Sequence, residues 1–129
     1  MTLEEIRQAF VDQLDSTWAT CSVIARPNKT FDPSNNGVWL KYKTLIGRPY
    51  EGEKRGVSIG TGIFHIDLNF PLDSGTRTSN IYAQRLEDGF RNESLGGVEC
   101  EDPNSYEIGE VAGYYRIVVQ VPFHYFKGE

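Results

Sequence analysis

The hydrophobic pattern is clearest in the middle of the chain. Between residues 64 and 70 every second residue is apolar, and the polar residues between them are His65, Asp67 and Asn69. A period of two with aromatic and branched side chains on one side is typical of a half-buried strand. Pro71 has no N–H to donate to a neighbouring strand, so the strand is expected to end there.

An amphipathic helix is predicted directly after this strand. Residues 73–75 are Asp-Ser-Gly, which favour a turn, and from Thr76 or Thr78 onward apolar residues recur at three- and four-residue steps. Such spacing places them on one face of a helix. That apolar face consists of Tyr82, Ala83, Leu86 and Phe90. A strand followed by an amphipathic helix is therefore the expected centre of a single core.

A second amphipathic helix is predicted at the start of the sequence. Thr2 and Glu5 have the spacing of a capping box, in which each side chain bonds the backbone N–H of the other residue. The apolar stripe of this helix is Leu3, Ile6, Phe10 and Leu14. Because its opposite face is mixed in charge rather than basic, packing on a sheet is favoured over binding to a membrane surface.

Further strands are predicted where apolar residues cluster or alternate, at 21–25, 38–46, 98–101 and 114–126. Three intervening polar stretches are predicted to be connections, namely 27–37, 47–56 and 106–113. Phe31 is expected to hold the first connection against the body of the protein. The second, which is densely charged and has no periodicity, is expected to project as a mobile loop between two strands of a hairpin.

These elements predict an α+β fold in which residues 1–129 form a single domain. The expected architecture has two layers, a single mixed or antiparallel sheet of about four to five strands with both helices packed on one face. The other face of the sheet should be polar, as is common in antiparallel sheets. It would carry Lys41, Lys43, His65, Asp67, Asn69, Arg116, Gln120 and His124.

Composition and charge make some functions improbable. The 129 residues carry a formal net charge of −5 without a cluster of Lys and Arg, which does not match a general nucleic-acid binder. No apolar run approaches the roughly 20 residues of a membrane span and no signal peptide is expected, which predicts the cytoplasm. Cys21 and Cys100 lack the spacing of a zinc site, so free thiols in a reducing compartment are expected.

Two stretches are candidates for chemistry, and each also has a structural explanation. Gly60 and Gly62 resemble part of a phosphate-binding motif, but His65 stands where the third glycine would be, and the glycines do not precede a helix. His65 and Asp67 share one face of a strand, and His124 could add a third metal ligand. Strand alternation alone also accounts for them. With no nucleophile motif present, no catalytic residue, metal or cofactor is assigned.

Aromatic residues, glycines and short apolar runs follow a particular order along most of the chain. The segments concerned are Ala25-Arg26-Pro27-Asn28, Phe31, Val38-Trp39-Leu40, the strand 62–71 with Gly75 and the helix 80–90, and finally Gly109, Gly113-Tyr114-Tyr115 and residues 119–123. Taken together, they resemble the tail terminator and tail completion proteins of long-tailed, lambda-like bacteriophages. The resemblance covers nearly the whole chain, and its specificity lies in the order of the segments.

The resemblance implies an assembly role rather than catalysis. Proteins of this family form a ring, typically a hexamer, on the last ring of the tail tube, where they stop tube growth and present a surface to the head. The implied partners are other copies of this chain, the major tail tube protein and the head–tail connector protein, with no recognition of nucleic-acid sequence and no membrane. The family fold, a sheet flanked by helices, agrees with the α+β architecture predicted from the residues.

A ring subunit needs recognition surface on several sides, and the loops 47–56 and 101–113 and the polar sheet face could supply it. The residues expected to contact a neighbour or the tube are Arg48, Glu51, Glu53, Lys54, Arg55, Asp67 and Arg116. Two alternatives stay open at this point. The chain could be a neck or minor tail protein of the same assembly, or a small ligand- or metal-binding domain that uses the face with His65, Asp67 and His124.

Overall fold

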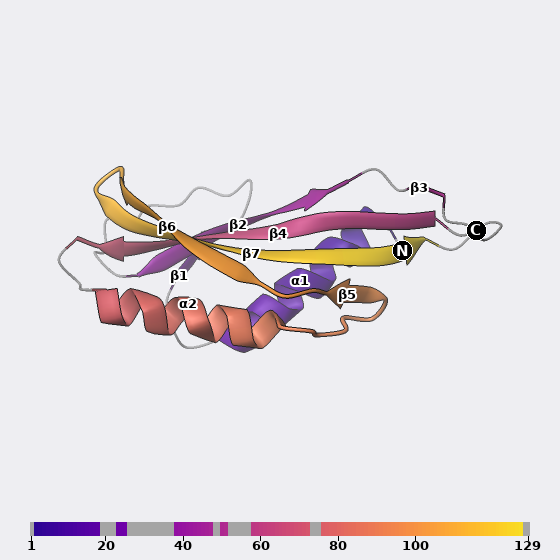
Figure 1. Cartoon of the computed structure of the whole chain (residues 1–129), viewed down its shortest axis with the longest axis horizontal. Coiled ribbons are helices and arrows are strands. Elements are labelled where there is room, and N and C mark those ends of the chain that lie inside the picture. The colour runs from indigo at the N-terminus through magenta and orange to yellow at the C-terminus, as the bar shows by residue number, and fades with distance from the viewer. Residues whose placement is uncertain are drawn as a thin grey trace.

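The computed structural model describes residues 2–18, 23–25, 38–47, 50–51, 58–72 and 76–127. Its elements are shown in Figure 1. They are, in chain order, α1 (Leu3–Trp18), β1 (Val23–Ala25), β2 (Trp39–Ile46), β3 (Tyr50–Glu51), β4 (Ser58–Pro71), α2 (Thr76–Phe90), β5 (Val98–Cys100), β6 (Asn104–Val111) and β7 (Tyr114–Lys127).

The strands form one sheet in which the order is β1-β2-β4-β7-β5, with β3 added to β4 and β6 added to β7. Among the described strands, only β1 and β2 pair in parallel, and the other pairings are antiparallel. The two 14-residue strands β4 and β7 pair along their whole length, from Ser58 opposite Lys127 to Pro71 opposite Tyr114. Both helices lie on one side of this central pair (Figure 1). The predicted two-layer α+β fold with one mixed sheet is therefore confirmed.

The N-terminal helix begins as its sequence predicts. Thr2 N donates to Glu5 Oε1 at 2.7 Å, and Glu5 N donates to Thr2 Oγ1 at 3.1 Å, which completes the capping box. The buried residues of α1 are Ile6, Phe10, Leu14 and Trp18. The buried stripe therefore continues one turn further than predicted, to Trp18, but does not include the predicted Leu3, which is 54% exposed.

Phe10 lies at the centre of the core. Its ring stacks on Phe64 of β4 with centroids 4.7 Å apart, and it contacts Phe123 of β7 at 4.8 Å and Phe90 of α2 at 6.1 Å. One residue therefore joins both helices to both central strands. The two helices also contact each other directly. Gln13 Nε2 of α1 donates a hydrogen bond to the carbonyl of Gly89 in α2 at 2.6 Å.

The glycines of β4 make room for aromatic rings of β7. A Cβ at Gly60 would lie 2.1 Å from the Tyr125 ring, and one at Gly62 would lie 2.5 Å from the Phe123 ring and 2.4 Å from the carbonyl oxygen of Leu45. These positions accept no side chain without rearrangement. The glycine pair is thus a packing feature of a strand, as expected from the failed phosphate-binding motif.

Two of the predicted connections contain strands. The expectation of a polar connection at 106–113 is wrong, because Asn104–Val111 is strand β6, paired with β7 through a bulge between Glu107 and Gly109. The stretch 47–56 also contains the two residues of β3. The pattern is weak in both, because β6 is exposed over most of its length and β3 is only two residues long.

Some expectations concern residues outside the described part of the chain. The loop 27–37 with its Phe31 is one of these, as are Cys21 and most of the charged stretch 47–56.

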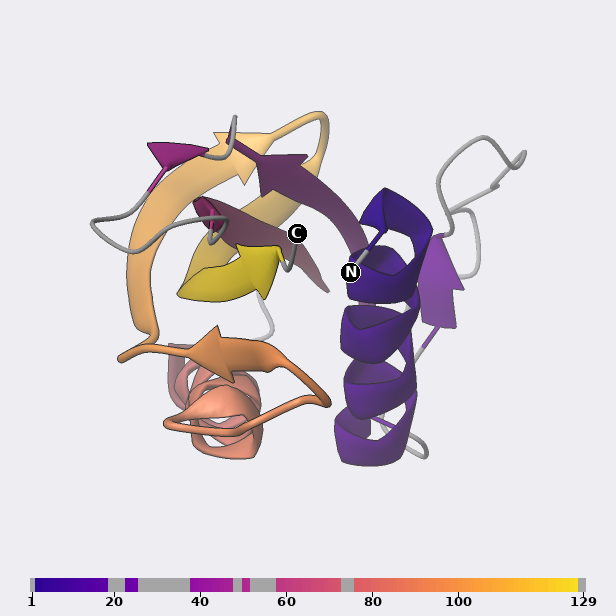
Figure 2. The same cartoon turned by 90° about the vertical axis from the view of Figure 1, so that its right-hand side faces the viewer.

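Viewed along the long axis in Figure 2, the described strands do not lie flat. The β6–β7 hairpin sweeps over the sheet, as expected for long antiparallel strands with the usual right-handed twist.

Candidate interaction surface

The face of the sheet opposite the helices is called here the helix-free face. On β4 it carries His65, Asp67 and Asn69, because the core residues occupy the alternate positions. The register places Lys41 and Lys43 of β2 opposite Asp67 and His65. Arg116 and Gln120 of β7 lie opposite Asn69 and His65 on the other side. The structure therefore brings the predicted polar residues of three strands together on one face.

His65 and Asp67 interact directly. Nε2 of His65 lies 3.0 Å from Oδ1 of Asp67, and Nε2 of Gln120 lies 3.3 Å from Nδ1 of His65. The tautomer that satisfies both contacts carries its proton on Nε2, which donates to Asp67, while Nδ1 accepts from Gln120. Only 14% of each side chain of the His65–Asp67 pair is exposed. The pair is a half-enclosed structural contact rather than an open acid–base site.

Asn69 is fully buried although it lies on the outer face of the sheet. Its Oδ1 accepts a 3.0 Å hydrogen bond from Arg116 Nε, and its Nδ2 donates to the Asp67 carbonyl at 3.3 Å. Trp39 of β2 and Tyr114 of β7, the two strands that flank β4, meet edge-on beside it with their ring centroids 5.6 Å apart. The predicted interaction residue Arg116 thus has a structural role on this face, where it satisfies a buried amide.

The three residues of the possible metal site do not come together. His124 lies opposite Thr61, four positions along β4 from His65, a spacing of about 13 Å along a strand. Its Nδ1 instead lies 3.0 Å from Oε2 of Glu101. Within the described ranges, no group of three His, Cys, Asp or Glu side chains is arranged to hold a metal ion. The geometry gives no support to the ligand- or metal-binding alternative.

Cys100 is a buried free thiol in β5, as the sequence predicted. The pKa of this thiol is raised from 9.0 to about 12, chiefly by burial and in smaller part by the carboxylates of Glu93 and Glu99. A thiol with so high a pKa is almost entirely protonated at neutral pH and is a poor nucleophile.

The predicted contact residues of the charged loop are outside the part of the chain that the structure describes. This applies to Arg48, Glu53, Lys54 and Arg55. Glu51 belongs to β3, which pairs with the first residues of β4, so its backbone is at the end of the sheet. The role of these five residues stays a prediction.

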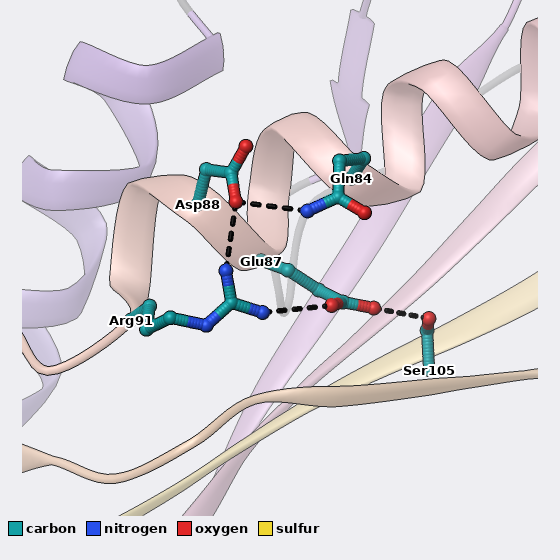
Figure 3. A network of polar contacts seen from close by, with 5 residues as sticks. All are labelled: Gln84, Glu87, Asp88, Arg91 and Ser105. Carbon is teal, nitrogen blue, oxygen red and sulfur yellow. Dashed lines mark hydrogen bonds and ion pairs between the residues drawn. The ribbon is translucent and has the colours of Figure 1, made fainter.

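A polar network attaches α2 to the edge strand β6 (Figure 3). Asp88 accepts hydrogen bonds from Gln84 Nε2 and from Arg91 Nη1, each at 2.8 Å. Arg91 Nη2 also donates to Glu87 at 3.2 Å, and Glu87 accepts a hydrogen bond from the Ser105 hydroxyl of β6. The network holds an exposed strand against a helix that is anchored in the core.

The sequence pattern missed β6 as a surface element. Two of its side chains, Tyr106 and Ile108, are large, apolar and roughly half exposed. The alternation of Ser105, Tyr106, Glu107 and Ile108 was a detectable strand signal. The bulge residue Gly109 and the preceding Asp-Pro-Asn sequence obscured it, because such residues more often mark turns.

A comparison with protein families decides what this fold belongs to. The family model described as phage tail terminator protein matches residues 5–123, which covers all of α2, most of α1 and β7 and all of the other described strands. This chain belongs to the phage tail terminator family. It is a structural or assembly component of a phage tail, and its place is the virion tail.

A comparison with solved structures found a protein with the same fold. One solved structure, whose title states no function, is 20% identical in sequence and has a TM-score of 0.70. The match covers 97% of this chain and 96% of that one, so the two proteins share the whole fold. A comparison with curated proteins found no match. Neither helix of the terminator has the length and apolar character needed to cross a membrane.

Proposed function

We propose that this terminator forms a closed ring, a hexamer, on the last ring of the tail tube. The ring ends tube growth and provides the surface on which the head–tail connector docks. The match to the terminator family over residues 5–123 carries this proposal. The fold supports it, since one continuous core leaves the sheet edges and the helix-free face for partners.

The proposed role requires no chemistry from the chain. The most enclosed titratable pair, His65 and Asp67, is a hydrogen-bonded structural contact, and the thiol of Cys100 is buried. The terminator therefore acts through binding surfaces, without a cofactor, while tails are assembled in the host cytoplasm. Its partners are other copies of itself, the major tail tube protein and the head–tail connector protein.

The charged loop supplies part of the contact surface in this proposal. Arg48, Glu51, Glu53, Lys54 and Arg55 combine both signs of charge within eight positions of the sequence, which suits a specific polar contact with a neighbour or with the tube. Reversing the charge of Lys54 and Arg55 should weaken ring formation or tail joining. Unchanged assembly with both charges reversed would remove these residues from the proposed interface.

The function is tested by the length of tail tubes. The tube protein of the same phage is produced with and without this chain, and tube lengths are measured by electron microscopy. A terminator gives tubes of one defined length with a cap at one end, whereas its omission gives tubes that continue to grow. Tubes of correct length without the chain, which then fail to join heads, would identify it as a neck protein instead.

A further inference from the structure

The two edges of the sheet carry charges of opposite sign. At one edge, residues 39–46 of β2 contain two lysines and no carboxylate. At the other edge, residues 98–111, which include β5 and β6, contain no Lys or Arg. Their carboxylates are Glu99, Glu101, Asp102, Glu107 and Glu110. Because β4 and β7 lie between these edges, the separation of charge is a property of the fold and not of one loop.

The basic edge consists of Lys41, Lys43 and Leu45, which alternate on the helix-free face of β2. All three are exposed, and Leu45 is a large apolar side chain with 47% of its surface accessible. Neither lysine has an ion-pair partner among the described residues. The short strand β1 pairs with β2 only as far as Lys41. Lys43 and Leu45 therefore lie at the outer boundary of the described sheet.

The acidic edge consists of Tyr106, Glu107, Ile108 and Glu110 of β6, all of them exposed. The register places Glu107 and Glu110 on the helix side, where the Tyr115 hydroxyl donates a hydrogen bond to Glu107, and Tyr106 on the helix-free face. Tyr106 and Ile108 are 44% and 49% accessible. In the described part of the chain β6 pairs with β7 alone, so its second edge has no strand beside it. Proteins usually protect an edge strand with charged side chains, Pro, a β-bulge or a covering element. β6 contains no Lys or Pro and is protected by its bulge and its two glutamates, which repel another acidic edge but not a basic one.

A closed ring of identical subunits needs two different, mutually complementary patches on each subunit. The two edges meet that requirement, because each combines exposed apolar side chains with charges that oppose those of the other. Like edges repel each other, which disfavours a two-fold dimer that would consume the same patch on both copies. The anchoring of β6 to α2 through Ser105 and Glu87 presents the acidic edge in a fixed position.

We propose that the basic edge of one copy docks on the acidic edge of the next copy around the ring. In this contact Lys41 and Lys43 of one copy face Glu107 and Glu110 on the helix side of β6 in the next copy. The inference rests on the proposed ring and names the surfaces that close it. Since part of the attraction is between exposed charges, the contact should weaken as salt concentration rises.

The test uses two variants of the full chain, each with one edge reversed in charge. Lys41→Glu with Lys43→Glu makes both edges acidic, and Glu107→Lys with Glu110→Lys makes both edges basic. Mass is measured by light scattering and native mass spectrometry across protein concentration at low salt. Glu4→Lys with Asp12→Lys on the exposed face of α1 is a control matched to the Glu107/Glu110 variant, because it raises the net charge by the same amount away from both edges.

Wild type and the control are expected to reach about six times the 14.6 kDa chain mass. Each edge variant alone should stay monomeric, with the thermal midpoint showing that it is folded. An equimolar mixture should recover the ring, because alternating the two variants places opposite charges at every contact in a ring with an even number of subunits. The chain that carries all four substitutions should recover it as well.

Several results would overturn the inference. Edge variants that assemble like wild type would show that other surfaces close the ring, and failure of the mixture would show that charge is not what the edges recognise. If the control variant loses assembly to the same degree, the effect of the edge variants is due to net charge and not to the edges. A wild-type chain that stays monomeric would also overturn it. The tube-length measurement then decides separately whether the proposed terminator function stands.

Discussion

Arg116 and Asn69 are joined across the two central strands by a hydrogen bond in which Arg116 Nε donates to an amide with no solvent exposure. Such a group is costly to leave unpaired, because a buried acceptor cannot exchange its lost partner for water. The bond therefore links the polar helix-free face to the stability of the central pair of strands.

Asn69→Ala is expected to reduce the free energy of unfolding by about 1–3 kcal/mol, since it removes a buried amide and frees Arg116. Urea unfolding at one fixed protein concentration measures this, because self-association makes apparent stability depend on concentration. Ser16→Ala changes an exposed residue of α1 as a control and should cost no more than about 0.5 kcal/mol. Equal losses in both variants would contradict the structural role of Asn69.

Gly62→Ala should be strongly destabilising although it adds a single methyl group. The new Cβ would lie 2.4 Å from the Leu45 carbonyl oxygen, a backbone atom that cannot move without disturbing the pairing of β2 with β4. We expect a loss of about 1–3 kcal/mol from this overpacking, measured by thermal unfolding. Thr61→Ala, at the adjacent exposed position, is the control. A thermal unfolding midpoint close to that of wild type would show that β2 and β4 accommodate the added methyl group without loss of stability.

Cys100 should be unreactive in the folded protein. Its pKa, raised to about 12 chiefly by burial and also by Glu93 and Glu99, leaves almost no thiolate at pH 8. In a Cys21→Ser background, alkylation by iodoacetamide should be slow in the native state and fast in denaturant. Rapid alkylation without denaturant would contradict the burial.

The same thiol makes stability depend on alkaline pH. Its folded pKa of about 12 is higher than the ordinary value of 9.0, so above pH 9.0 the unfolded chain loses this proton first. The stabilisation is complete below pH 9.0 and is lost as pH rises from there towards 12. Comparing the midpoints of urea unfolding at pH 8 and pH 10 measures the effect. The stability of Cys100→Ala should fall less between pH 8 and pH 10 than that of the parent chain.

Thr2→Ala should weaken the start of α1 by about 0.5–2 kcal/mol, because it removes one of the two reciprocal bonds of the capping box. Hydrogen exchange at the first turn of the helix, together with urea unfolding, measures this. Glu4→Ala changes a residue that lies between Thr2 and Glu5 in the sequence and is the matched control. Protection that is unchanged by Thr2→Ala would show that packing of Ile6 and Phe10 alone sets where the helix begins.

Local patterns in the sequence were sufficient for the main elements. The alternation that ends at Pro71, the helical spacing from Tyr82 to Phe90 and the capping box of Thr2 are confirmed, because each depends on residues close together in the chain. The same reasoning placed the polar residues on the helix-free face. A strand with a period of two permits only one assignment of faces once its apolar side is buried.

The sequence by itself therefore determined the main elements, the two layers and the composition of each sheet face. Only the tertiary structure decided that β6 is a strand, since its residues acquire that form through pairing with β7. It also decided that Asn69 is buried and that His124 is far from His65, because both outcomes depend on the register between strands distant in sequence. The opposite charges of the two edges likewise became a shared feature only when strand order placed β2 and β6 on opposite sides of the central pair.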